Sequence, residues 1–387
     1  MNHTARAAWV WGSADVQGGC GCPSWVRRAL LGVTLLLVIF GLLSVYSASS
    51  FLAESEGLPD SHYLLLQAAR AGVGLVALAV ASLVDYRIYR KLAWPLLGLS
   101  AALLIFLLLP WTHGLSPTIN GARRWLRLPG FAFQPSELAK LAVVIWTAAL
   151  AVRKQDRLGS LRYGLLPFLL VDGFVCLLIL AEPHFSAAML TATLAFLVLF
   201  SAGGRLSHFV FLGLLGVPLV VDQVVNTGYR MNRLMAFVHP GMGAADVGYQ
   251  LRQSLIAVGS GGVFGVGFGE SRQKLYYLPE PQNDFIFPII AEEWGLIGSV
   301  VLLGLFLVWA LLGLRIAAAA GDLFGRLLAI GLTGMVAVGA FAHFGVTIGV
   351  LPTTGVNLPF VSAGGTGLVF ALAATGILLN IAAPRRC

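Results

Sequence analysis

Long apolar runs separated by short polar segments dominate the pattern of hydrophobic and polar positions. A membrane-spanning helix needs about 20 mostly apolar residues, and ten stretches of the chain approach this length. They cover residues 29–49, 63–84, 92–110, 137–152, 164–181, 186–202, 207–223, 286–314, 326–348 and 366–383. The pattern predicts an all-α polytopic protein with about ten transmembrane helices surrounded by membrane lipid.

The composition indicates the same class. Of 387 residues, 58% are hydrophobic and 11% are charged, whereas a soluble globular protein carries roughly 25% charged residues. The net charge of +8 comes from basic residues scattered between the apolar runs, so we expect no nucleic-acid partner. The cysteines are too few and too dispersed for a disulfide framework or a structural zinc site, and we expect free thiols. They are Cys20, Cys22, Cys176 and Cys387.

Lysine and arginine gather in the loops on one side of the predicted bundle, and that side is ordinarily cytoplasmic. The first loop on the other side carries Glu54, Glu56 and Asp60 and no basic residue. With ten spans both termini are expected in the cytoplasm, so that residues 1–26 form a cytoplasmic tail and residues 27–384 the membrane domain. The first apolar run resembles a signal peptide at its end, but its length of about 21 residues favours an uncleaved span.

Two outer segments carry basic residues that the topology does not require. One is the loop 111–136, and the other is a large outer loop, 224–283, between the seventh and eighth spans. Loops longer than about 15 residues are usually functional or disordered, and the aliphatic residues of the second favour an ordered outer cap. The basic residues are Arg123, Arg124 and Arg127 in the first segment and Arg230, Arg233, Arg252, Arg272 and Lys274 in the second.

Charged side chains at membrane depth are costly and are functional candidates by default. Glu137 and Lys140 are three residues apart on one helical face and can pair. The pair is either a structural lock between helices or part of a site. Arg70, Asp172 and Asp222 are single charges for which we expect helix-packing hydrogen bonds.

Three carboxylates lie at the start of the eighth span. Glu292 and Glu293 are adjacent, so their side chains point about 100° apart on a helix and at most one can serve a site. Asp284 follows two prolines and is predicted at the N-cap position, where a carboxylate simply caps the helix. Its apolar neighbours at a water–lipid boundary favour an alternative, a partly desolvated carboxylate with the raised pKa of a general base. The residues alone leave both interpretations open.

The uncharged segment 352–367 is rich in proline and glycine. Irregular backbone at membrane depth is tolerated only where it is buried in protein or lines a cavity, and we expect it to line one. The N–H groups of Gly364 and Gly365 either bind an anion at the start of the last helix or form a plain re-entrant turn. An outer cavity with a candidate base and several arginines suits a lipid-linked anionic substrate.

Short motifs recur in a specific order along residues 29–383. They are Val45-Tyr46-Ser47-Ala48-Ser49, Asn120-Gly121-Ala122-Arg123-Arg124-Trp125, Gln134-Pro135-Ser136-Glu137-Leu138-Ala139-Lys140, Gly248-Tyr249-Gln250, Gln253-Ser254, Gly265-Val266-Gly267-Phe268-Gly269, Gln273-Lys274, Asp284-Phe285-Ile286-Phe287, Glu292-Glu293 and the segment 352–365. Together they resemble the SEDS family of peptidoglycan glycosyltransferases, FtsW, RodA and SpoVE. The family has ten helices and a large outer loop between helices 7 and 8, in agreement with the apolar runs.

The resemblance implies that the protein polymerises lipid II, an undecaprenyl pyrophosphate-linked disaccharide pentapeptide, into β-1,4 glycan at the outer face of the cytoplasmic (inner) membrane. Asp284 matches the family's essential aspartate, thought to take a proton from the acceptor sugar's 4-hydroxyl, which then attacks the donor's anomeric carbon. The resemblance implies further substrate contacts. They are Arg123, Arg124 and Lys274, which would neutralise the pyrophosphate, and Glu137, Lys140, Gln253, Ser254, Ser362 and Gly364.

Family members work with a class B penicillin-binding protein, a single-span transpeptidase, and with other divisome or elongasome proteins. The segments 271–275 and 277–280 look more like the division and sporulation branch than the elongation branch. The cofactor is unknown, with a divalent cation such as magnesium as one candidate. After the fifth span, however, His184 stands where the family usually has an acid, and a neutral histidine is a poor ligand for a hard cation.

Two other functions suit the same residues. A lipid II flippase also places charged residues and broken helices inside a bundle, and it would tolerate Asp284→Asn if the cavity stayed polar. A catalytically idle scaffold that recruits division partners would survive the loss of both Asp284 and Arg124. A glycosyltransferase that uses Asp284 as its base would lose almost all turnover in Asp284→Asn and keep substrate binding.

Overall fold

A computed structural model describes residues 22–384 except 113, 119–121, 129–130, 227 and 239–244. Helices make up nearly all of the regular structure in these residues, and a single two-stranded antiparallel hairpin accompanies them. The predicted all-α class is therefore confirmed. Cys20, Cys387, Asn120 and Gly121 lie outside the described residues, whereas Cys22 and Cys176 are free thiols as expected.

The ten predicted spans appear in order. Their bounds are α1 Ser24–Ser55, α2 His62–Leu83, α3 Arg87–Leu108, α4 Pro135–Arg153, α5 Leu166–Ala181, α6 Phe185–Ser201, α7 Leu206–Val225, α10 Ile286–Ala319, α11 Leu323–Thr347 and α12 Gly365–Ile381. Among the described residues, eight helices are long and apolar enough to cross a membrane, if α5 is counted with the single turn of π-helix, η5 Leu161–Leu165, before it. Helices α6 and α12, with 17 residues each, lie at the short end of the spanning range of about 17–25.

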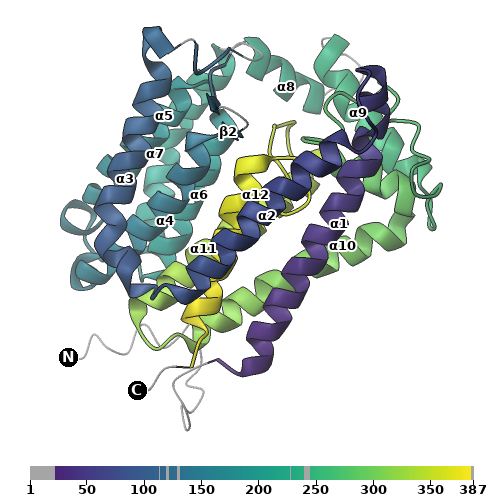
Figure 1. Ribbon diagram of the computed structural model, residues 1–387. Helices are drawn as coiled ribbons and strands as arrows, with labels where there is room; N and C mark the ends of the chain where they lie inside the picture. Colours follow the sequence, from purple (N-terminus) through teal and green to yellow (C-terminus); the bar gives the residue numbers. More distant parts are fainter. Residues whose placement is uncertain are drawn as a thin grey trace.

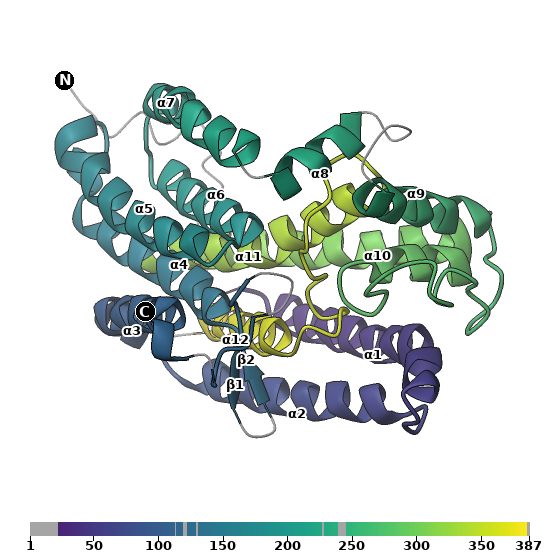
Figure 2. The same cartoon turned by 90° about the horizontal axis from the view of Figure 1, so that it is seen from above.

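The bundle has an inner and an outer set of helices. Most side chains of α4 and α11 are buried. In contrast, no side chain in the apolar stretch of α7 is buried, and Leu214 and Leu215 are exposed. Helices α2 and α12 pack closely (Figures 1 and 2). Gly376 permits this close packing, because a Cβ atom there would lie 2.3 Å from the backbone oxygen of Leu78.

The polar connections gather at one end of the bundle. The hairpin of β1 Leu126–Leu128 and β2 Phe131–Phe133 lies there with α8 Gly228–Val238 and α9 Ala245–Ser260, opposite the end at which α1 begins and α12 ends (Figure 1). Short 3-10 helices follow α3 (Pro110–Thr112) and α4 (Gln155–Arg157). The described part of the large outer loop between the seventh and eighth spans thus forms an ordered cap.

Helix α10 is broken near its outer end. Gly295 has φ 65° and ψ −161°, which lie outside the helical region, and a residue with a side chain adopts such a conformation only at high cost. A Cβ atom there would also lie 2.4 Å from the backbone nitrogen of Gly265. The break separates a half-helix, Ile286–Trp294, from the long membrane-crossing remainder of α10.

The single charges in the spans differ in their surroundings. Asp172 is buried and accepts a hydrogen bond from the hydroxyl of Thr147 on α4 (3.2 Å), as predicted for helix packing. Arg70 donates to the backbone oxygen of Ala363 (3.1 Å). The prediction is wrong for Asp222, which is exposed and accepts a bond from Asn226 at the end of its own helix, because α7 is not packed among neighbours there.

We expect Gly376→Ala to destabilise the protein by about 1–3 kcal/mol, because the added methyl group forces α2 and α12 apart. Gly72→Ala is the matched control on α2, since a Cβ atom at Gly72 meets nothing within 4 Å. That control should stabilise by up to about 1 kcal/mol through helix propensity. Thermal unfolding in detergent measures both, and equal melting temperatures for the two variants would contradict the packing argument.

Candidate active site

Asp284 lies in the turn that leads into α10. The prediction that it occupies the N-cap position is wrong: Phe285 is the N-cap residue, and α10 has no side-chain cap. The chain before the helix is already held by other hydrogen bonds. The Ser362 hydroxyl donates to the backbone oxygen of Asn283 (2.8 Å), and the N–H of Ala363 donates to the backbone oxygen of Gln282 (3.0 Å). The carboxylate is thus not used as a helix cap.

The carboxylate of Asp284 lines a cavity of about 980 Å³ beneath the outer cap. The walls come from seven parts of the chain, namely the loop after α3, the α5–α6 connection, the end of α7, α8, α9, the loop before α10 and the segment before α12. Gly355 lets the last segment pass close to Asp284, because a Cβ atom at Gly355 would lie 3.0 Å from Oδ2. This volume lies in the range of about 300–1,000 Å³ that is usual for small-molecule sites.

Three arginines from different elements line the same cavity. Arg124 precedes β1 and donates to the backbone oxygen of Pro183. Arg230 donates to the side-chain oxygen of Gln223 (2.7 Å), and Arg233 donates to the backbone oxygen of Thr353 (3.0 Å). Their guanidinium groups form a positive wall, which suits a phosphate or pyrophosphate group.

Burial raises the pKa of Asp284 to about 6, and the negative charge of Glu280 adds to this effect. The positive charges of Arg233 and Arg124 act in the opposite direction. A carboxylate with a pKa near 6 is still ionised at neutral pH, and it is a better proton acceptor than an ordinary aspartate. The alternative that the sequence left open, a general base, therefore has the electrostatics it needs.

A narrow second cavity of about 70 Å³ adjoins the large one. The two share His184, Ser186 and Gly355 in their walls. Glu137 and Lys140 line the narrow part and form an ion pair of 2.8 Å along α4. Both side chains keep partial exposure to it, so the pair faces a cavity rather than a helix interface.

Ser362 and Gly364 also line the narrow cavity. The Ser362 hydroxyl accepts a bond from the N–H of Leu358 (2.8 Å) in addition to the one it donates to Asn283. It therefore ties the segment before α12 to the turn that carries Asp284. Gly364 is the N-cap residue of α12, as expected for the start of the last helix.

His184 lies at the junction of the two cavities and is buried. Its Nδ1 is 3.4 Å from the hydroxyl of Ser136. Burial lowers its pKa to about 3, and the charges of Arg124 and Lys140 add to this, so the ring is neutral. A neutral imidazole beside two cations does not offer the oxygen donors that magnesium prefers, and the described residues hold no cluster of three metal-ligating side chains. No step of the mechanism is therefore assigned to a metal.

The remaining predicted residues, Arg123, Gln253, Ser254 and Lys274, lie outside the linings of both cavities. Arg123 donates to the backbone oxygen of Leu109 (3.3 Å). Ser254 is buried and donates to that of Thr347 (2.6 Å), and Gln253 lies beside it on α9. Tyr249 and Gln250, four residues earlier, line the large cavity in their place. Lys274 is buried in an ion pair with Glu293 (3.3 Å).

From the sequence alone, Arg230 and Arg233 are only two of the basic residues in the outer loop that the topology does not require. Their spacing of three residues on α8, which places both on one helical face, was the available signal. Neither of the adjacent glutamates reaches a cavity: Glu292 accepts bonds from Ser271 and from backbone N–H groups, and Glu293 is paired with Lys274. The prediction that at most one of them serves a site agrees with this placement.

Residues 27–387 match the family described as "Cell cycle protein", which comprises FtsW, RodA and SpoVE. The chain belongs to this family. It is 42% identical over 354 residues to the probable peptidoglycan glycosyltransferase FtsW of Trichlorobacter lovleyi, covering 92% of each chain. It is 39% identical over 352 residues to the stage V sporulation protein E of Bacillus subtilis, covering 91% of this chain and 95% of that one. These relatives agree with the predicted closeness to the division and sporulation branch.

A solved structure supports the same assignment. A chain from a peptidoglycan synthase complex, described as coordinating polymerization and crosslinking, superposes with a TM-score of 0.75 at 29% identity. The match covers 92% of this chain and 96% of that one. Membership of this family, together with the long apolar helices, establishes a multi-pass membrane protein.

Glu182, beside Pro183 at the cavity wall, has an unusual environment. Its side chain is buried, and neither carboxylate oxygen has a hydrogen-bond partner among the described residues. Burial raises its pKa to about 9, although Arg124 acts against this. The folded protein therefore binds one proton more than the unfolded chain between the ordinary carboxyl pKa and about pH 9, so this group makes stability fall as pH rises through that window.

We expect Glu182→Gln to reduce the loss of stability between pH 5 and pH 9, because the amide has no proton to release. Melting temperatures of wild type and variant in detergent across this pH range measure the effect. The variant should gain relative to the wild type as pH rises. Glu54→Gln, an exposed carboxylate on α1, is the control, and parallel curves for wild type and Glu182→Gln would refute the assignment.

Proposed function

We propose that the protein is a peptidoglycan glycosyltransferase that polymerises lipid II into β-1,4 glycan at the outer face of the cytoplasmic membrane, with Asp284 as general base. The observation that carries the proposal is the position of Asp284, whose carboxylate has a raised pKa and faces a cavity of about 980 Å³ walled by three arginines. The name of the FtsW relative supports the same activity.

The chemistry requires one base and a stabilised leaving group. Asp284 accepts the proton of the acceptor sugar's 4-hydroxyl while that oxygen forms a bond to the donor's anomeric carbon. The bond from this carbon to the pyrophosphate oxygen breaks, and undecaprenyl pyrophosphate leaves with the electron pair. Arg124, Arg230 and Arg233 stabilise the negative charge that develops there. One displacement of this kind inverts the configuration of the anomeric carbon.

The narrow cavity is proposed to continue the substrate site. Glu137 and Lys140 offer a carboxylate and an ammonium group to a polar substrate, and Ser362 and Gly364 line the same space. We do not assign four other residues to substrate. Arg123, Ser254 and Lys274 are bonded to other protein groups, and Gln253 lies outside both cavity linings. The positive-inside pattern supports a cavity on the outer side of the membrane and both termini in the cytoplasm.

The proposal extends to partners. The structural relative from a synthase complex supports joint action with a class B penicillin-binding protein that cross-links the product. The sequence relatives support a role in cell division or sporulation with other proteins of that machinery.

We expect Asp284→Asn to lower the rate of lipid II polymerisation at least about 100-fold, because general base catalysis contributes roughly 10²–10⁴-fold. Binding should persist, since the amide keeps the shape and polarity of the cavity. The assay is glycan formation from purified lipid II by the protein with its co-expressed transpeptidase. Asp222→Asn, an exposed aspartate on α7, is the matched control and should retain the wild-type rate.

The outcomes of this assay separate the alternatives. Glycan from Asp284→Asn at near the wild-type rate would defeat the mechanism. Movement of lipid II between leaflets without any glycan would indicate a flippase. In the wild type, kcat/KM should fall as the pH drops below about 6, because it reports the free enzyme, in which protonated Asp284 cannot accept a proton.

We expect Arg233→Gln to weaken lipid II binding roughly 10- to 100-fold, which is the scale of one hydrogen bond to a charged group. The effect should shrink as ionic strength rises, because salt screens the remaining charges. Arg252→Gln on α9 removes the same charge from an exposed position outside the cavity and serves as the control. Equal affinities for the two variants would remove Arg233 from the proposed anion site.

A further inference from the structure

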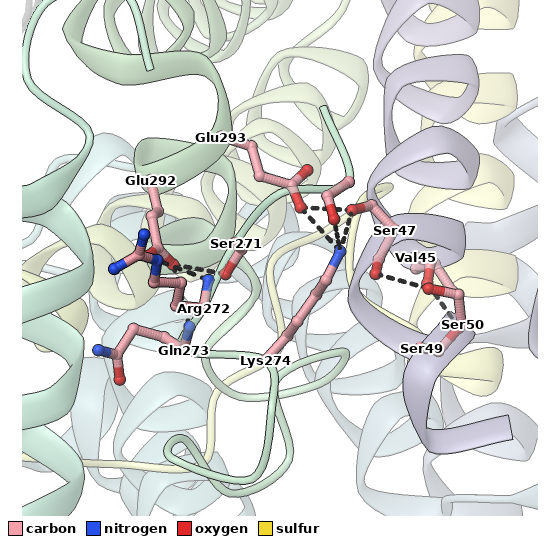
Figure 3. A network of polar contacts seen from close by, with 11 residues as sticks. Val45, Ser47, Ser49, Ser50, Ser271, Arg272, Gln273, Lys274, Glu292 and Glu293 are labelled. Carbon is pink, nitrogen blue, oxygen red and sulfur yellow. Dashed lines mark hydrogen bonds and ion pairs between the residues drawn. The ribbon is translucent and has the colours of Figure 1, made fainter. Parts of the chain in front are cut away.

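A buried polar network lies beside the cavity but does not line it. Figure 3 shows its two centres, the carboxylates of Glu292 and Glu293 at the inner end of the α10 half-helix. Glu293 accepts hydrogen bonds from Ser47 of α1 and from Lys274 (3.3 Å). The Lys274 ammonium also donates to the backbone oxygen of Gly269 (2.5 Å). The ion pair is almost wholly buried, with side-chain exposures of 6% and 2%.

Glu292 binds a different part of the outer loop. Its carboxylate accepts bonds from the hydroxyl of Ser271 and from the N–H groups of Arg272 (3.3 Å) and Gln273 (3.3 Å). Adjacent helical side chains point about 100° apart. The half-helix is therefore attached in two directions, and the two attachments together fix its rotation about its own axis as well as its position.

The backbone around the break completes the attachment. The N–H groups of Val266 and Gly267 donate to the backbone oxygens of Glu292 (3.0 Å) and Glu293 (3.1 Å), respectively. Gly265 has φ 81°, and a Cβ atom there would lie 2.1 Å from the oxygen of Glu293. The loop thus takes the place of the next helical turn, and this network holds the inner end of the half-helix, while Ser362 and Ala363 hold the turn at its outer end.

Asp284 lies two residues before the other end of this half-helix. The half-helix is about 2.5 turns long, and its internal hydrogen bonds make it a short rigid rod. A rotation or shift at the Glu293 end is therefore transmitted to the Asp284 end. The turn that carries Asp284 is thus held at one end by Ser362 and at the other, through the half-helix, by contacts of Glu293 outside the cavity lining.

We propose that Glu293, through Lys274 and Ser47, is a positioning residue for the base Asp284 and makes the catalytic geometry depend on α1 and the outer loop. The inference rests on the proposed function in one respect, the role of Asp284 as base. It assigns a function to a charged pair that is buried at high cost and would otherwise have none, since a buried pair does not by itself imply stability.

The test compares Glu293→Gln with Asp172→Asn in the full-length protein with its co-expressed transpeptidase. Both variants replace a buried acid by its amide, but Asp172 lies on α5, bonded to Thr147, outside both cavities. Two quantities are measured, namely amide hydrogen exchange of residues 286–294 and the kcat and KM for lipid II polymerisation. The exchange measurement does not depend on activity.

In Glu293→Gln we expect exchange in residues 286–294 to rise at least about tenfold, since local opening becomes easier. We expect kcat to fall roughly 10- to 100-fold, the scale of a small misplacement of a catalytic group, with KM unchanged. Asp172→Asn should change neither quantity. The charge-swapped pair Lys274→Glu with Glu293→Lys should recover part of both, because it restores an ion pair at the same place.

If Glu293→Gln does not fold, Ser47→Ala replaces it, because this variant removes one donor and leaves no unpaired charge. Its expected effects have the same direction and smaller size. Unchanged exchange, or raised exchange with wild-type kcat, would overturn the positioning role. A wild type that makes no glycan would defeat the proposed function instead, and the exchange rates would then still decide whether Glu293 holds the half-helix.

Discussion

Every polar group at membrane depth must find a partner inside the protein, because hydrocarbon offers none. The break of α10 at Gly295 meets this constraint through the loop around Gly265. The N–H groups of Leu296 and Ile297 donate to the backbone oxygens of Gly262 (2.9 Å) and Val263 (3.2 Å). In the other direction, N–H groups of the loop donate to the backbone oxygens of Glu292 and Glu293, before the break. The outer loop is thus bound to the membrane bundle by an exchange of backbone hydrogen bonds, and the same bonds permit the break in α10.

The sequence predicted the spans well, because the requirement for about 20 apolar residues acts locally and leaves a visible run. It also singled out Asp284, Arg124 and the pair of Glu137 and Lys140, all of which line the cavities. It did not predict the ion pair of Lys274 with Glu293, because a single charge in a loop looks the same whether it meets a substrate or a buried glutamate. That distinction depends on Glu293, which is 19 residues away, and on Ser47, which is more than 200 residues away. Such long-range pairings leave no periodic signal.

Residues 182–184, of which Pro183 and His184 line the large cavity, show how burial sets the charge of groups around a cavity. His184 is neutral because burial and two neighbouring cations act together on its pKa. Glu182 is protonated because burial outweighs the attraction of Arg124. Both groups therefore contribute no net charge at neutral pH. The positive charge of Arg124 acts on Glu182 and on Asp284 alike and lowers the pKa of both.

The strength of Asp284 as a base depends on its pKa, which burial and nearby charges change in both directions. Burial and Glu280 raise its pKa, while Arg233 and Arg124 lower it. A pyrophosphate group bound between these arginines would offset their charge at Asp284, as any opposite charge does. The pKa of Asp284 would then rise from about 6 toward neutrality once the donor is bound. A base whose pKa approaches the working pH transfers protons most efficiently, so an occupied donor site would itself prepare Asp284 to activate the acceptor.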